Sequence, residues 1–157
     1  MSQLSVQLAA SIRSERAGIQ ALIEVLTVER HALTQGDTDR LTETAPRKRE
    51  LLLHISHLGE QRNRVLERGG FSADRRGMES WLTTNDTGAA RAEWTALLDL
   101  TQNAHRLNRE NGAYIDAGMR ANQQALQALM SASAAAGTYG PGGRSVSPVA
   151  SRTLASA

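Results

Sequence analysis

The sequence contains no cysteine, and only 3% of its residues are aromatic. The absence of cysteine excludes disulfide bonds, thiolate catalysis and cysteine-ligated metal sites. Because aromatic residues are so scarce, a core must be built from leucine, isoleucine, valine, alanine and methionine. A chain of 157 residues is long enough for one domain with a continuous nonpolar seam, and short for a two-domain enzyme.

Lysine is almost absent as well: Lys48 is the only one, and arginine supplies the other basic side chains. The 18 basic residues exceed the 16 acidic ones only because residues 137–157 contain Arg144 and Arg152 and no acid. The rest of the chain is neutral, so its composition does not predict binding to nucleic acid. The basic run at residues 47–49 has acidic neighbours within one helical turn, which favours a solvated helix face of mixed sign.

Neither a targeting segment nor a membrane span is predicted. The first ten residues lack the positive start and the nonpolar run of a signal peptide. The longest stretch without charge, residues 121–143, is rich in glutamine, serine, alanine and glycine and is too polar to cross a bilayer. We therefore expect a cytoplasmic protein without direct membrane insertion.

Nonpolar residues recur at intervals of three, four or seven over residues 2–35, which is the period of one face of an α-helix. Charged residues, among them Glu15 and Glu29, occupy positions between them. Gly36 can adopt the left-handed conformation that ends a helix. The predicted nonpolar face consists of Leu4, Leu8, Ile12, Ile19, Leu22, Leu26 and Leu33.

Asp37 is the predicted N-cap of a second helix, because its carboxylate can accept from the first free backbone N–H groups. Pro46 predicts a kink or a restart in this helix, since proline lacks an N–H group and clashes with the preceding turn. Gly69 and Gly70 predict its end. The expected nonpolar stripe comprises Leu41, Ala45, Leu52, Ile55, Leu58, Val65 and Leu66.

A short helix and a very long one follow. Asp74 can cap the short helix within residues 71–86, and the long helix covers about residues 87–133. In the middle of the long helix, the nonpolar face carries polar or small residues. Hydrogen bonds that fix the register of a bundle explain such residues better than a ligand site does. The nonpolar residues of this face are Trp94, Leu97, Leu98, Leu107, Ile115, Met119, Leu126 and Leu129, and its polar or small ones are Thr101, His105, Asn108, Asn111 and Gly112.

Together these patterns predict an all-α fold, an elongated, antiparallel, coiled-coil-like bundle of three long helices and one short helix. The bundle domain is expected to span residues 1–136, and residues 137–157 to form a flexible tail rich in glycine, serine and proline. The first helix would be ~45 Å long and the last ~70 Å. If the two start at a common end, residues 118–133 form an overhang whose nonpolar side chains need a cover.

No catalytic residue and no cofactor site is predicted. His54 and His57 lie three residues apart, close enough on a helix to share a metal ion, but no further ligand pattern accompanies them and solvated histidines are the better interpretation. The glycine-rich residues 137–143 lack the lysine and the following helix of a phosphate-binding loop. No serine or threonine lies in the context of an activated nucleophile. We therefore expect neither an enzyme nor a metal site.

Three stretches, taken in order, resemble the FlgN family, the cytoplasmic chaperones of flagellar type III export. The first is the leucine-rich helix that ends at Gly36 and Asp37, followed by Lys48, Leu51, Leu52, Ile55, Leu58 and Arg62. The others are Asn108, Asn111, Gly112, Ile115 and Asn122 in the last helix, and then Tyr139, Gly140, Pro141, Gly142 and Gly143. The resemblance implies a non-enzymatic chaperone that keeps the hook–filament junction proteins monomeric. It would hand them to the export gate or to export ATPase components.

We expect a C-terminal helical segment of the client to bind along the overhang of the last helix, as a helix in a groove. The expected contact residues are Ile115, Met119, Leu126, Leu129 and Met130. The alternative is a coiled-coil or adaptor protein that forms a homo-oligomer, in which a second copy covers the same surface. Tyr139 has two interpretations: it docks to the export gate as an aromatic anchor, or it packs on its own helix as a C-cap contact.

Overall fold

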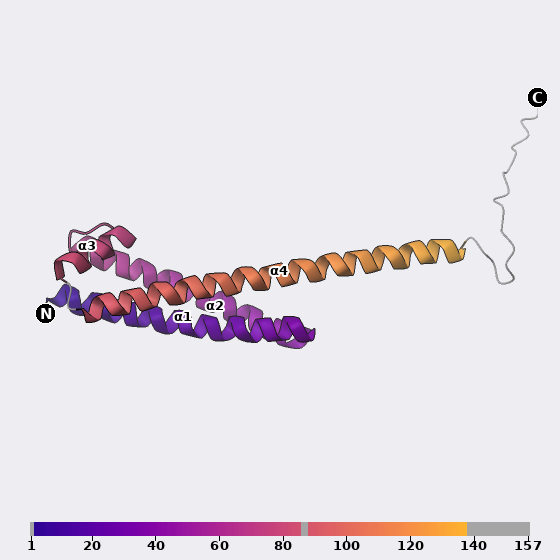
Figure 1. The fold of residues 1–157 in the computed structure, drawn as a ribbon, viewed down its shortest axis with the longest axis horizontal. Coiled ribbons are helices and arrows are strands. Elements are labelled where there is room, and N and C mark those ends of the chain that lie inside the picture. Colours follow the sequence, from indigo (N-terminus) through magenta and orange to yellow (C-terminus); the bar gives the residue numbers. More distant parts are fainter. Residues whose placement is uncertain (1, 86–87, 138–157) are drawn as a thin grey trace, which may run out of the picture. The chain divides into compact units, whose positions relative to one another are not determined.

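The computed structural model describes residues 2–85 and 88–137, which form four α-helices and no strand. The helices are α1 (Gln3–Gln35), α2 (Thr38–Arg68), α3 (Arg75–Asn85) and α4 (Ala89–Gly137) (Figure 1). They confirm the predicted all-α fold of three long helices and one short helix. The chain divides into two compact units, Met1–Ile115 and Asp116–Ala157. All but the first residue of the predicted tail lies outside the described residues, so the tail stays a prediction.

The turn between α1 and α2 follows the predicted capping signals. Gly36 has φ 65°, in the left-handed region that a residue with a side chain rarely adopts, and it ends α1. The carboxylate of Asp37 then accepts the backbone N–H of Arg40 at 3.1 Å and caps α2. The chain therefore reverses within two residues, and α1 and α2 form a helical hairpin.

Pro46 lies inside α2, which continues through it to Arg68. The restart considered from the sequence does not occur. Proline removes one backbone hydrogen bond, to the carbonyl of Thr42, but the following turns propagate the helix. The helix ends where Gly69 was predicted to end it, with the Gly69 N–H directed to the carbonyls of the last turn.

The start of α3 depends on Asp74 and on a glycine. The Asp74 carboxylate accepts the Gly77 backbone N–H at 2.9 Å and the Ser72 hydroxyl at 2.7 Å. These hydrogen bonds, the one from Gly77 above all, hold the pKa of Asp74 below its usual value. A β-carbon at Gly77 would lie 1.8 Å from the Ser72 carbonyl oxygen, so no other residue fits without rearrangement. The predicted cap is confirmed.

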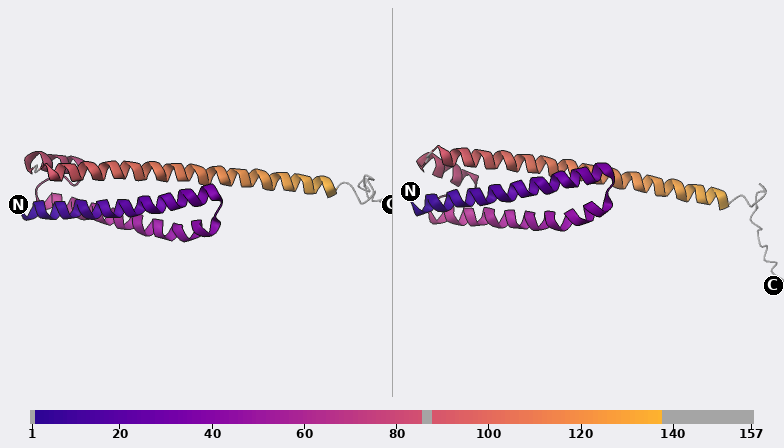
Figure 2. Two further views of the ribbon diagram at one scale, coloured as in Figure 1. Left: turned by 60° about the horizontal axis from the view of Figure 1, so that its bottom comes forward. Right: turned by 90° about the horizontal axis from the view of Figure 1, so that it is seen from below.

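The first unit has one nonpolar core. In it α1 and α2 lie side by side, and α3 and the first part of α4, residues 89–115, complete the packing (Figures 1 and 2). The core is aliphatic apart from two tryptophans, as the composition requires. Its buried members are Leu8, Ile12, Ile19, Leu22, Leu26, Leu51, Leu66, Met78, Trp81, Leu82, Trp94, Leu97 and Ala104.

The predicted nonpolar stripe of α2 is confirmed at Ile55, Leu58, Val65 and Leu66, which are buried or half-buried, and is wrong by one residue at Leu52. Leu51 is buried, whereas Leu52, which was placed in the stripe, is 42% exposed and Leu53 is 74% exposed. Successive residues of a helix point about 100° apart, so only one of three consecutive leucines can face α1 directly. Periodicity alone did not identify which one it is.

The described part of the second unit, residues 116–137, is the C-terminal part of α4, and each of its residues is exposed. The helix begins at Ala89, two residues after the predicted start, and continues to Gly137, four residues beyond the predicted end. None of the helices in the described ranges combines the length and the nonpolarity that a bilayer crossing requires.

Candidate functional site

A buried polar cluster joins three helices of the first unit. Glu29 of α1 is 5% exposed and accepts from Lys48 of α2 at 3.1 Å and from the side-chain amide of Asn111 of α4 at 2.9 Å. Asn111 is fully buried and also donates to the Leu26 carbonyl at 2.9 Å. A buried carboxylate is tolerated only when it is paired and hydrogen-bonded. The cluster therefore fixes the register of α1, α2 and α4 relative to one another.

The cluster reaches the surface through Arg30. Its Nε donates to the Asn111 side-chain oxygen at 2.8 Å, and a second guanidinium nitrogen donates to Glu110. Hydrogen bonds from Arg30 and then Arg106 hold the pKa of Glu110 below its usual value. The Arg30 guanidinium also lies 5.1 Å from the ring centroid of Tyr114, a cation–π contact that holds an aromatic ring at the surface.

A second buried ion pair lies at the other end of the hairpin. Arg62 of α2 donates to Glu15 of α1 at 2.7 Å, and the two side chains are 13% and 8% exposed. The Arg62 guanidinium also lies 5.1 Å from the ring of Trp94 on α4. Burial raises the pKa of Glu15, and the neighbouring Arg62 opposes that shift. Like the Glu29 cluster, this pair joins α1, α2 and α4.

The burial of Glu15 and Glu29 corrects the sequence analysis, which set both among the charged positions between the nonpolar ones. Each lies three residues after a buried residue, Ile12 and Leu26, and so belongs to the same helix face. That spacing was the available signal. Because Glu15 pairs with a late residue of α2 and Glu29 with an early one, α1 and α2 run antiparallel.

The predicted polar seam of α4 is confirmed at Asn111 and not along its whole length. Asn108 is half-buried, whereas His105 and Thr101 are exposed, and the Thr101 hydroxyl donates to the carbonyl of Leu97 at 2.8 Å. Asn111 carries the register because it alone of these polar residues lies fully inside the first unit.

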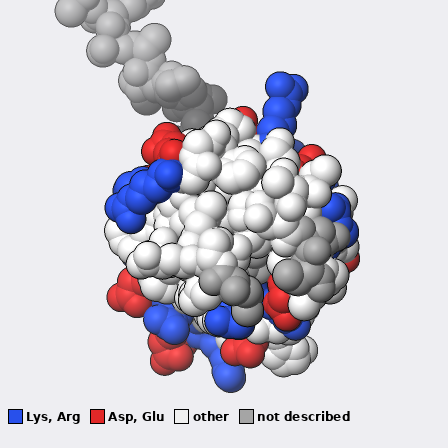
Figure 3. Space-filling model, turned by 90° about the vertical axis from the view of Figure 1, so that its left-hand side faces the viewer, with Lys and Arg blue, Asp and Glu red and all other residues white. Residues whose placement is uncertain are grey.

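The basic run of α2 is divided by the fold. Lys48 points inward to Glu29, while Arg47 lies 3.6 Å from Glu50 at the surface. Figure 3 shows the end of the first unit where α1 begins, and there basic and acidic side chains alternate around an uncharged area. Neither region presents the single-signed surface that phosphate backbones require.

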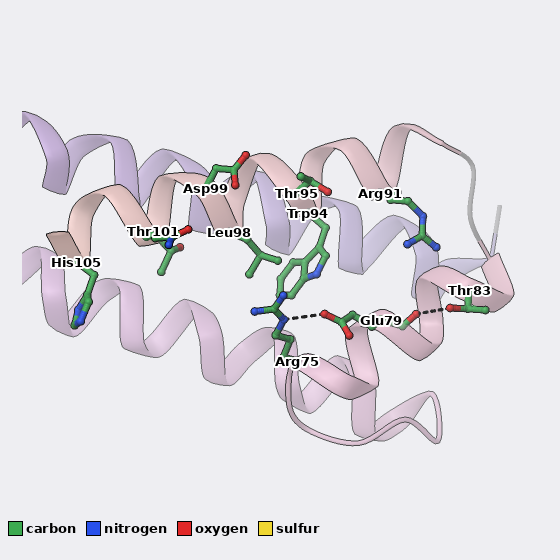
Figure 4. Close-up of a pocket in the computed structure, with 11 residues that line it drawn as sticks. Arg75, Glu79, Thr83, Arg91, Trp94, Thr95, Leu98, Asp99, Thr101 and His105 are labelled. Atoms are coloured by element: carbon green, nitrogen blue, oxygen red, sulfur yellow. Dashed lines mark hydrogen bonds and ion pairs between the residues drawn. The ribbon is translucent and has the colours of Figure 1, made fainter.

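A polar cleft of 840 Å³ lies in the first unit between α3 and α4 (Figure 4). Arg75 and Glu79 of α3 form an ion pair at 2.7 Å on one side, and Trp94 and Leu98 of α4 lie on the other. The side chains of Asp99 and His105, also in the lining, point in different directions in Figure 4. Asp99 and His105 therefore do not form a hydrogen-bonded pair suited to general acid–base catalysis.

The two histidines of α2, His54 and His57, do not belong to a group of metal-ligating side chains among the described residues. Both are exposed, and the His57 ring lies 3.0 Å from the side-chain amide of Gln61. Among the described residues, no group of three side chains is placed to hold a metal ion.

The largest exposed nonpolar surface of the described α4 lies in the second unit. Its large side chains, which we name the α4 stripe, are Met119, Leu126, Leu129 and Met130, with exposed fractions of 59%, 60%, 66% and 72%. Their spacing places them within an arc of roughly 100° on the helix. Ile115, the last residue of the first unit, is 39% exposed, and Tyr139 lies outside the described residues.

A family model described as FlgN protein matches residues 1–147 of the chain. No curated protein and no solved structure matches it significantly.

Proposed function

Because the chain belongs to the FlgN family of flagellar export chaperones, we propose that it binds hook–filament junction proteins in the cytoplasm. It holds these clients apart from one another before assembly and delivers them to the type III export apparatus, through the export gate or export ATPase components. It acts by binding and not by catalysis.

The exposure of the α4 stripe is the observation that carries this proposal. Four large nonpolar side chains, each more than half exposed, lie on one helix face. Burial of a leucine or methionine side chain contributes ~1.5–3 kcal/mol, so a client helix laid along the stripe gains substantial affinity. Methionine adapts its shape to different neighbours, which suits a surface that receives more than one client. Ile115 extends the proposed contact by one turn.

The test is the double variant Leu126→Ala/Leu129→Ala. It removes two exposed side chains and leaves the core of the first unit intact, so helicity and melting should change little. Affinity for a peptide from a junction-protein C-terminus should fall by roughly tenfold to a hundredfold, measured by calorimetry. The matched control is Gln124→Ala/Ser131→Ala on the opposite face of the same helix.

Unchanged affinity in the leucine variant would refute the binding site. A large loss of melting temperature would refute it too, because Leu126 and Leu129 would then belong to the protein's own core.

A second candidate function rests on the same exposed surface: a coiled-coil protein whose second copy covers the α4 stripe. Mass measured in solution, with and without the client peptide, separates the two functions. A chaperone gives a one-to-one complex with the peptide, whereas a self-associating adaptor gives a dimer that the peptide does not alter.

Delivery to the export gate is proposed to use Tyr139. Tyr139→Ala should retain junction-protein binding and reduce export and filament growth, scored as motility of cells that carry only this variant. Normal motility would leave the C-cap contact as the role of Tyr139.

Deletion of residues 143–157 should change the melting temperature little, because the segment has few residues that can pack.

A further inference from the structure

The second unit differs in charge from every other described part of the chain. In its described part, residues 116–137, the two charged residues are Asp116 and Arg120, within the first five positions, and residues 121–137 contain none. All of these residues are exposed on a helix. An exposed helix ordinarily carries charged side chains on its solvent face. Because residues 121–137 carry none, a partner cannot form an ion pair with them.

The two sides of the α4 stripe also differ in size. One side is lined by alanines at helical spacing, namely Ala121, Ala125 and Ala132. The other side carries Gln123 and Gln127. Interaxial distances of packed helices vary from about 8 to 10 Å with the side chains at the contact, so the alanine side admits the closer approach.

We propose, on the basis of the function proposed above, that residues 116–137 take a client helix with a nonpolar contact face and uncharged flanks, seated toward the alanine side. A charged side chain on the client flank would lose water and find no opposite charge among residues 121–137, which is costly. Specificity therefore comes from shape and from rejection of charge. The glutamines border the contact with neutral hydrogen-bonding groups.

The first test is the salt dependence of client binding to the full chain. Affinity for a junction-protein C-terminal helical peptide is measured in about 0.1 M and about 1 M NaCl, between which the Debye length falls from ~10 Å to ~3 Å. The dissociation constant should change by less than about threefold, because no ion pair is screened. A weakening of more than about tenfold at high salt, about 1.4 kcal/mol, would overturn this inference and leave the chaperone function standing.

The second test locates the contact with a matched pair of substitutions. Ala132→Gln enlarges the alanine side, and Ser131→Gln makes a comparable uncharged change about 100° away, on the face opposite the α4 stripe. Ala132→Gln should weaken peptide binding by about tenfold, because the client helix can no longer approach closely. Ser131→Gln should alter it by less than about twofold. Circular dichroism confirms that both variants keep the helix.

The outcomes separate the two proposals. Equal effects of the two substitutions, or a larger effect of Ser131→Gln, would overturn the seating on the alanine side alone. A wild-type chain that does not bind the peptide, or a dimer that the peptide does not dissociate, would overturn the client assignment together with the proposed function.

Discussion

The two parts of α4 have similar sequence patterns and opposite surroundings. In residues 89–115, Trp94, Leu97, Ala104 and Asn111 are buried. In residues 116–137, leucines and methionines recur at comparable helical intervals, yet all are exposed. A nonpolar helix face stabilises a fold only where the chain supplies something to pack against it. The first part belongs to the protein's own core, and the second is exposed along its whole described length.

The polar residues differ between the parts in the same way. Asn111 in the first part donates two hydrogen bonds and accepts a third, whereas Asn122 in the second part is exposed. Both asparagines contributed to the family resemblance. The resemblance therefore draws on a residue that builds the first unit as well as on an exposed residue of the second.

The largest difference between the two parts is expected for leucine truncation. Leu97→Ala should lower the free energy of unfolding by about 2–5 kcal/mol, because it opens a cavity in the core of the first unit. Leu126→Ala should change it by less than about 0.5 kcal/mol, because the side chain is already exposed. Urea denaturation monitored by circular dichroism measures both. Similar losses would show that the two parts of α4 are equally buried and would remove the comparison.

Replacing an asparagine in each part of α4 should also change the free energy of unfolding differently, by a smaller amount than leucine truncation does. Asn111→Ala should cost about 1–3 kcal/mol, since it removes the buried amide that donates to Glu29 and accepts from Arg30. Asn122→Ala should change the free energy of unfolding by no more than about 0.5 kcal/mol. Equal denaturation midpoints for the two variants would contradict a register role for Asn111.

Glycine replacement should affect both parts alike, because helix propensity acts without packing. A β-carbon at Gly112 or Gly118 meets nothing within 4 Å. Replacement by alanine should stabilise the helix by about 0.5–1 kcal/mol at either position. The Gly112 variant is measured by the melting temperature and the Gly118 variant by helicity on heating. A destabilising effect at Gly112 would reveal a contact that the structure does not contain.

The smallest effect concerns the acid dependence of the first part. The folded-state pKa of Glu110 is lowered by Arg30 and Arg106, so its stabilising contribution is present above the ordinary value of 4.5 and is lost as the pH falls below it. Glu110→Gln should therefore melt at a lower temperature than the wild type at neutral pH, and the difference should close in acid. A difference that persists or grows in acid would contradict this sign.

The sequence alone determined the helices, their caps and the family. Periods of three and four specify an α-helix, and Gly36, Asp37, Gly69 and Asp74 act through backbone geometry and hydrogen bonds within a few residues. Such local effects need no knowledge of the rest of the fold. The same reasoning identified the nonpolar side chains on the last helix.

Periodicity predicted the buried face of α1, but the tertiary structure alone decided which neighbouring positions join the core. It placed Leu51 and not Leu52 against the core, and turned Glu15, Glu29 and Lys48 inward to pair across helices. Periodicity is a property of one helix, whereas burial depends on which side chains of the neighbouring helices pack against that helix. A charge enters a core only when its partner arrives with it, and that pairing exists only in the folded chain.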